Sequence, residues 1–174
     1  MEHSWQVATI AHALALIHNE DFAGDVDANA VATAALYHDV SEIITGDLPT
    51  PIKYHSEKIR DAYKQIELEA EEELLGLLPS KLQRFYRPFL ISHEIDPEIE
   101  VFIKSADIIS AYIKCQQEVA AGNIEFQAAL EDVESRLKQQ NRPEVEVFMG
   151  AFNEGYLLTL DELLQQHDRT LTKV

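Results

Sequence analysis

A helical apolar pattern runs through residues 97–120, which read PEIEVFIKSADIISAYIKCQQEVA. The apolar side chains recur at steps of three and four residues, as on one face of a helix: Ile99, Phe102, Ile103, Ala106, Ile109 and Ile113. The predicted helix begins at Asp96 or Pro97 and ends near Ala120, before Gly122. Asp107 lies in the middle of the pattern, where a carboxylate is costly to bury unless it is paired or bound to a ligand.

The same period continues along most of the chain. Further helices are predicted over about residues 3–19, from a cap at Asp25 or Asp27 to His38, over about 56–78, between Pro79 and Pro88, over about 125–140 and over 143–166. No segment alternates apolar and polar residues as a half-buried strand would. The predicted fold is therefore all-α, a helix bundle, and the length of 174 residues predicts a single domain over residues 1–174.

Charge and composition exclude several classes of partner. The net charge of −17 disfavours long nucleic acids, which need a basic face to displace counterions. A small phosphorylated substrate is compatible with this charge if a bound cation inverts the local field, although the charge can equally serve solubility alone. No apolar run approaches the roughly 20 residues that span a bilayer, and the first residues do not resemble a signal peptide. We expect a soluble, cytoplasmic protein with no membrane partner.

A histidine and an aspartate stand next to each other at the predicted end of the second helix, His38-Asp39. Consecutive helix residues point about 100° apart, so both can bind one ion only where it lies beside the helix end. An imidazole together with a carboxylate suits Mn, Co, Zn or Fe. The pair alone does not establish a metal site, because an inward histidine is usually satisfied within the core.

Two further polar groups are predicted to face inward from other helices, His3 and Asp107. One cation bound by these two together with His38 and Asp39 would explain all four groups, since helix bundles build metal sites from facing helices. Separate hydrogen bonds and salt bridges, for instance between Asp107 and a lysine on its own helix, would explain them equally well. Spacing alone leaves both interpretations open.

Longer strings resemble the HD-domain metal-dependent phosphohydrolases, and among them the bacterial 5′-deoxynucleotidases of the YfbR type. The family pattern of a histidine, an adjacent His-Asp pair and a later aspartate is similar to the order His3, His38-Asp39, Asp107. The likeness covers essentially the whole chain and is most specific in four strings: Glu2-His3-Ser4, Tyr37-His38-Asp39-Val40-Ser41-Glu42, Thr45-Gly46-Asp47-Leu48-Pro49-Thr50-Pro51 and Lys104-Ser105-Ala106-Asp107. It implies an HD-domain helix bundle.

The resemblance also implies an activity, a cofactor and an assembly. The activity is hydrolysis of nucleoside 5′-monophosphates, chiefly deoxynucleoside ones, to nucleoside and phosphate. The cofactor is one divalent cation, with cobalt or manganese favoured over zinc, nickel, iron or magnesium. The assembly is a homodimer. Two other functions stay open: hydrolysis of another small nucleotide by the same type of domain, and a non-catalytic module that binds a nucleotide or a metal.

Site residues follow from the same resemblance. It implies that the metal ligands are His3, His38, Asp39 and Asp107. Glu42, a little past His38, is expected to act as general base or acid. The substrate is expected to contact His3, Asp39, Asp47, Leu48, Pro49, Thr50 and Asp107.

Family members also carry about two dozen residues before the segment that matches Glu2-His3, with an Arg-Trp pair that orients phosphate and excludes ribose, whereas the sequence given starts at Met1. In the resembled family, this pair is the main basis for a preference for deoxyribose over ribose.

Overall fold

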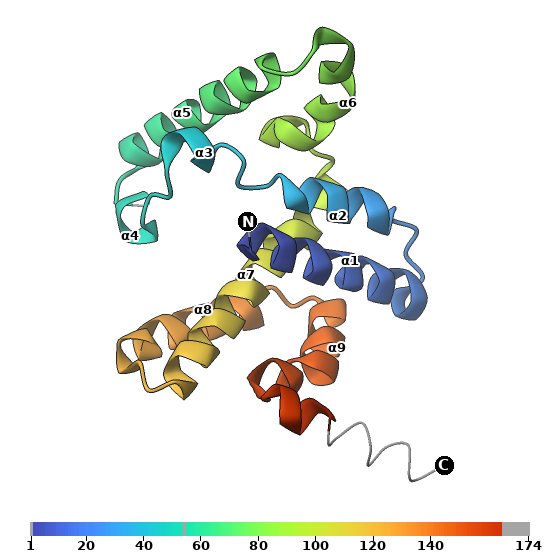
Figure 1. Ribbon diagram of the computed structural model, residues 1–174, viewed down its shortest axis with the longest axis vertical. Coiled ribbons are helices and arrows are strands. Elements are labelled where there is room, and N and C mark those ends of the chain that lie inside the picture. The colour runs from blue at the N-terminus through green and yellow to red at the C-terminus, as the bar shows by residue number, and fades with distance from the viewer. Residues whose placement is uncertain (1, 54, 165–174) are drawn as a thin grey trace.

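A computed structural model describes residues 2–53 and 55–164, apart from the side chains of Thr50 and Pro51, and its regular elements in this part of the chain are helices (Figure 1). The α-helices are α1 (Glu2–Phe22), α2 (Ala28–Leu36), α3 (Glu42–Thr45), α4 (Thr50–Lys53), α5 (Glu57–Gly76), α6 (Ser80–Leu90), α7 (Pro97–Ala120), α8 (Gln127–Gln139) and α9 (Pro143–Phe152). Short 3-10 helices are η1 (Ser92–Glu94), η2 (Ile124–Phe126) and η3 (Glu154–Leu157). The predicted all-α class is confirmed.

The main core forms where α1 packs against α2, α7 and α9 (Figure 1). From α1 it takes Val7, Ile10 and Leu14, which are almost completely buried. The apolar face predicted for residues 97–120 supplies the α7 side, and its members Phe102, Ile103, Ala106, Ile109 and Ile113 are buried. Because apolar burial is the main favourable term in folding, this packing fixes how the first third of the chain meets α7.

Helix ends in this core follow the capping signals of the sequence. The Asp27 carboxylate accepts hydrogen bonds from the backbone N–H groups of Asn29 and Ala30, at 2.9 and 3.1 Å, and so begins α2. Asp96 caps α7 in the same way, with Pro97 in the first turn. Both predicted starts are confirmed, and α2 ends at Leu36, so His38 and Asp39 lie in the turn that follows it.

Several predicted boundaries differ from those in the structure. Pro88 lies inside α6, two residues before the helix ends at Leu90, instead of ending it, and the hydrogen bond that its missing N–H cannot make is one of the last in the helix. α8 begins at Gln127, since residues 124–126 form the 3-10 turn η2. α9 ends at Phe152, well before the predicted end, because the 3-10 turn η3 follows it; Gln166 itself lies outside the described residues.

α5 and α6 extend away from the core on the side of α3 and α4 (Figure 1). Tyr63 of α5 is buried and donates a hydrogen bond from its hydroxyl to the carbonyl oxygen of Gly46, at 2.8 Å. Gly46 has φ +68°, a conformation that side chains rarely adopt, so a glycine is needed at this turn. Lys53 of α4 pairs with Glu67 of α5 at 2.7 Å. These contacts hold the segment between α2 and α5 in place.

Across residues 2–53 and 55–164, we find no helix whose length and apolar content would let it cross a bilayer.

Candidate metal centre

The turn after α2 presents His38 and Asp39 side by side. His38 Nδ1 lies 2.8 Å from the carbonyl oxygen of Ala35, one turn back, and an N–H there donates to that oxygen. The opposite ring nitrogen, Nε2, is buried and makes no hydrogen bond within the described part of the chain. It lies 2.9 Å from Asp39 Oδ2. The backbone contact with Ala35 therefore fixes the ring so that Nε2 faces the Asp39 carboxylate.

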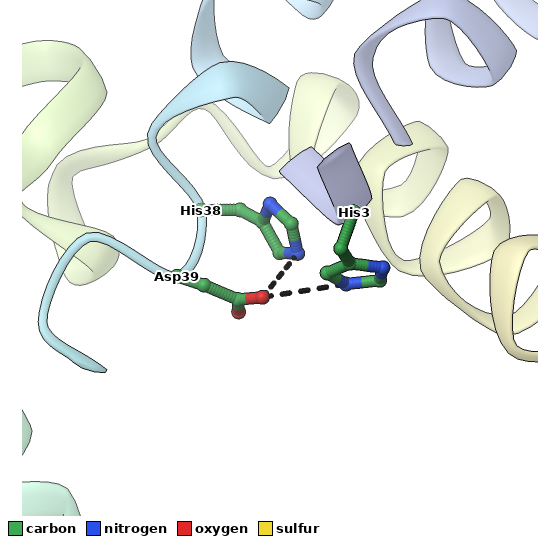
Figure 2. Close-up of side chains that lie close together, drawn as sticks. All are labelled: His3, His38 and Asp39. Atoms are coloured by element: carbon green, nitrogen blue, oxygen red, sulfur yellow. Dashed lines mark ion pairs between the residues drawn. The ribbon is translucent and has the colours of Figure 1, made fainter. Parts of the chain in front are cut away.

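His3, in the first turn of α1, meets this pair from the other side. Figure 2 shows both imidazole rings turned toward Asp39, with the His3 Nε2 atom 3.4 Å from Asp39 Oδ2. The ring centres of His3 and His38 are 5.3 Å apart. His3, His38 and Asp39 each offer a ligand atom, and these atoms all lie within 4.8 Å of one another. Residues more than thirty positions apart thus share one small volume.

Asp107 joins the group through His3. Its Oδ1 atom lies 3.2 Å from His3 Nε2. The lysines that could have paired with it in a separate salt bridge are engaged elsewhere, Lys104 with Glu100 at 2.6 Å and Lys114 with Glu118. The alternative of a lysine partner on the same helix is therefore wrong.

The exposure of these groups differs from the prediction. The side chain of His38 is 10% exposed, as expected of an inward residue, but those of His3 and Asp107 are 44% and 46% exposed. The spacing of apolar residues shows the direction in which a side chain points. It does not show how deeply that turn of the helix is buried. The first turn of α1 and the middle of α7 both border an open cavity. The argument from the cost of burial therefore applies to His38 and not to His3 or Asp107.

The electrostatics of the cluster favour a cation at its centre. Contacts with the carboxylates of Asp107 and Asp39 raise the pKa of His3 to about 10. Burial opposes ionisation of Asp39, but the two histidines outweigh it and lower the pKa of that carboxyl. Burial likewise opposes protonation of His38, and the adjacent Asp39 outweighs it and raises its pKa. Without a metal, the imidazolium of His3 provides the positive charge between two carboxylates.

The donor set fits a divalent transition metal, and three of its members, His3, His38 and Asp39, are close enough to share one ion. Two imidazoles with carboxylates are a common ligand set for such ions. A metal-bound histidine usually donates its other N–H to a carbonyl or carboxylate, as His38 does to Ala35. The buried Nε2 atom of His38, which lies 2.9 Å from Asp39 Oδ2, is then the atom left for coordination. The part of the chain that the structure describes thus contains a candidate His/Asp metal site.

A cavity of about 1340 Å³ opens in front of the cluster. Among the predicted site residues it is lined by His3, Asp39, Glu42, Asp47, Leu48 and Asp107. Pro49 is exposed and does not line it, and the side chain of Thr50 lies outside the described part of the structure.

Glu42, the first residue of α3, stands at the cavity wall between the cluster and the following loop. Its backbone N–H donates to the carbonyl oxygen of Asp39 at 3.0 Å, which ties it to the same turn. Burial and the nearby charges of Asp39 and Asp47 raise the pKa of its carboxyl. A carboxyl group with a raised pKa is suited to exchanging protons near neutral pH.

Other lining residues were not predicted for this role: Trp5, Gln6, Thr9, Ser110, Gln117, Arg136 and Tyr156. Those on α7 could have been found, because Asp107, Ser110, Lys114 and Gln117 follow one another at helical spacing. Arg136 and Tyr156 carry no such signal, because only the packing of α8 and η3 brings them to the cavity.

The fold defines the class of protein. A solved HD-domain phosphohydrolase from Listeria innocua superposes with a TM-score of 0.75, covering 99% of this chain and 85% of that one, at 24% sequence identity. The chain therefore has the fold of the HD-domain phosphohydrolases, as the sequence predicted.

Sequence comparison gives the family within this class. The model of the YfbR-like 5′-deoxynucleotidases matches residues 1–156, and the chain belongs to this family. It is 47% identical over 162 residues to a 5′-deoxynucleotidase from Vibrio vulnificus and 48% identical to one from Photobacterium profundum, in each case over 93% of this chain and 84% of the relative. A 5′-deoxynucleotidase from Photorhabdus laumondii is 48% identical and is covered over 82% of its length. The predicted family and the class of hydrolytic enzyme are confirmed.

We expect the stabilisation that His3 gives the metal-free protein to vanish at high pH. A raised pKa means that the folded state binds the proton more tightly than the unfolded state does. The contribution is therefore complete below the ordinary histidine pKa of about 6.5 and is lost as the pH rises through about 10.

In the presence of a chelator, the melting temperature of the unmodified chain should exceed that of His3→Gln at about pH 7, and the gap should close by about pH 10.5. His55→Gln, at an exposed position, controls for the loss of a histidine as such. A difference in melting temperature between the unmodified chain and His3→Gln that does not change with pH would contradict the raised pKa of His3.

Proposed function

We propose that this chain removes phosphate from nucleoside 5′-monophosphates, with deoxynucleotides preferred, by means of a divalent cation held by His3, His38, Asp39 and Asp107. The observation that carries the proposal is the approach of His3 Nε2 to Asp39 at 3.4 Å and to Asp107 at 3.2 Å, beside the His38 Nε2 atom, which lies 2.9 Å from Asp39. Membership of the YfbR-like family, whose relatives are named 5′-deoxynucleotidases, supports the substrate class.

The proposed cation is cobalt or manganese, with zinc, nickel, iron or magnesium as alternatives. Mixed imidazole and carboxylate ligands support a first-row transition metal more than calcium. Bound at this site, such an ion would supply the Lewis acidity that activates water and neutralises charge on the phosphate. The residues of the chain would hold the ion and leave the cavity side open to substrate, because His3 and Asp107 are half exposed there.

In the proposed reaction, a water oxygen attacks phosphorus and the bond between phosphorus and the ester oxygen of the 5′ carbon breaks. The water loses a proton, and the departing alkoxide gains one. Glu42 would move these protons as general base or acid, and its raised pKa and its place at the cavity wall support that role. Asp39, Asp107 and His3 would border the phosphate.

The sugar is proposed to bind the segment that follows α3. Asp47 and Leu48 line the cavity, and the Asp47 carboxylate would accept a hydrogen bond from the 3′-hydroxyl. The contacts of Tyr63 with Gly46 hold this segment rigidly, which a binding loop requires. Contacts from Pro49 and Thr50 remain predictions of the sequence resemblance, as do the homodimer and the cytoplasmic location.

Asp39→Ala should abolish metal-dependent release of phosphate from deoxynucleoside 5′-monophosphates while leaving the helical content almost unchanged. The substitution removes a carboxylate that both histidines contact, and it removes no buried apolar group. Phosphate release with added cobalt or manganese and far-ultraviolet circular dichroism measure the two properties. Asp61→Ala, at an exposed position on α5, is the matched control. Unchanged turnover in Asp39→Ala would exclude the proposed metal site.

Glu42→Ala should keep metal affinity and lower turnover by about 10²- to 10⁴-fold, the usual contribution of a general acid or base. Metal binding by titration and turnover at saturating substrate separate the two effects. Glu73→Ala on α5, also an exposed glutamate, should behave as the unmodified chain. Loss of the metal in Glu42→Ala would instead make Glu42 a ligand. If the unmodified chain hydrolysed cyclic nucleotides and not monophosphates, the proposed substrate class would be wrong and the chain would have another HD-domain activity.

A further inference from the structure

A buried serine links the second nitrogen of His3 to α7. Ser110 lies one turn after Asp107 on α7, and the residue is only 2% exposed. Its hydroxyl oxygen lies 3.2 Å from His3 Nδ1. The same hydroxyl donates a hydrogen bond to Gln6 Oε1 at 2.8 Å, and Gln6 lies one turn after His3 on α1. Two successive turns of α1 are thus joined to α7 by a chain of three side chains, those of His3, Ser110 and Gln6.

This chain of hydrogen bonds has a direction. A serine hydroxyl carries one hydrogen, and here that hydrogen goes to Gln6 Oε1. Its lone pairs remain, so the contact with His3 requires an N–H on Nδ1 that donates to Ser110. When a neutral imidazole carries its hydrogen on Nδ1, the Nε2 atom has a free lone pair. Nε2 is the atom that faces Asp39 and Asp107.

We propose that Ser110 and Gln6 are positioning residues that hold His3 with its hydrogen on Nδ1, so that Nε2 is the atom offered to the metal. The inference rests on the proposed metal site and adds a means of orienting one of its ligands. The second histidine of the cluster is oriented by a backbone carbonyl, that of Ala35, so it depends on no side chain. His3 is half exposed in the first turn of α1, and the partner of its Nδ1 atom is a side chain of another helix, Ser110.

α7 provides a matched control for the removal of a buried hydroxyl. Ser105 is as buried as Ser110, but its hydroxyl donates to the carbonyl oxygen of Val101 in its own helix. Replacing either serine by alanine removes the same atoms from the same helix. Only the replacement of Ser110 removes the oxygen that accepts the hydrogen bond from His3 Nδ1.

The first test is titration of the full chain with cobalt, followed by calorimetry or by the visible absorption of the bound ion. Ser110→Ala should weaken cobalt binding by about 10- to 100-fold, the usual effect of removing a group that orients a metal ligand. Gln6→Met, which removes the acceptor at a half-buried position, should weaken it in the same range. Gln6→Glu keeps an acceptor and should bind within about threefold of the unmodified chain, and Ser105→Ala should match it.

The second test is the position of the hydrogen on His3 in the zinc-loaded protein, read from nitrogen-15 couplings in the imidazole ring. The unmodified chain and Gln6→Glu should show the hydrogen on Nδ1, and Gln6→Met should show a mixture. Equal cobalt affinity and an unchanged hydrogen position in both Ser110→Ala and Gln6→Met would overturn the inference while leaving the metal site intact. Failure of the unmodified chain to bind cobalt would overturn the proposed metal site, and the inference with it.

Discussion

The site depends on one contact between distant parts of the chain, the meeting of His3 with the carboxylates of Asp39 and Asp107. It forms because the buried faces of α1 and α7 pack together and place the first turn of α1 against the middle of α7. The cluster itself is partly exposed and adds little apolar burial. The packing of the core therefore fixes the positions of the charged side chains in the site.

The sequence predicted the fold, and it predicted that His3, His38, Asp39 and Asp107 come close together, but it did not predict how exposed they are. The spacing of apolar residues from Ile99 to Ile113 gave α7 and its buried face, and Asp27 gave the start of α2. His38-Asp39 and Asp107 stood out because polar groups within apolar patterns need an explanation. The half-exposed state of Asp107 was not predicted. The spacing of apolar residues along one helix does not show which of its turns the neighbouring helices cover.

Tertiary contacts explain the other gaps. Gln6 and Ser110 look like ordinary polar residues of amphipathic helices, and only the crossing of α1 and α7 shows that their side chains meet at 2.8 Å. Arg136 reaches the cavity from α8, far from every motif. Such residues border a cluster whose members the sequence singles out as candidate ligands. The proposed cation would let a chain with a net charge of −17 bind a phosphate, because a bound ion can invert the local field.

The central claim is that two histidines and two aspartates from three segments bind one ion. Anomalous X-ray scattering from crystals of the full chain grown with cobalt, measured at the cobalt absorption edge, tests it most directly. The account predicts one strong peak about 2.0–2.2 Å from the Nε2 atoms of His3 and His38 and from a carboxylate oxygen of each aspartate. A fully occupied cobalt peak elsewhere, with this cluster closed on itself by direct hydrogen bonds, would contradict it.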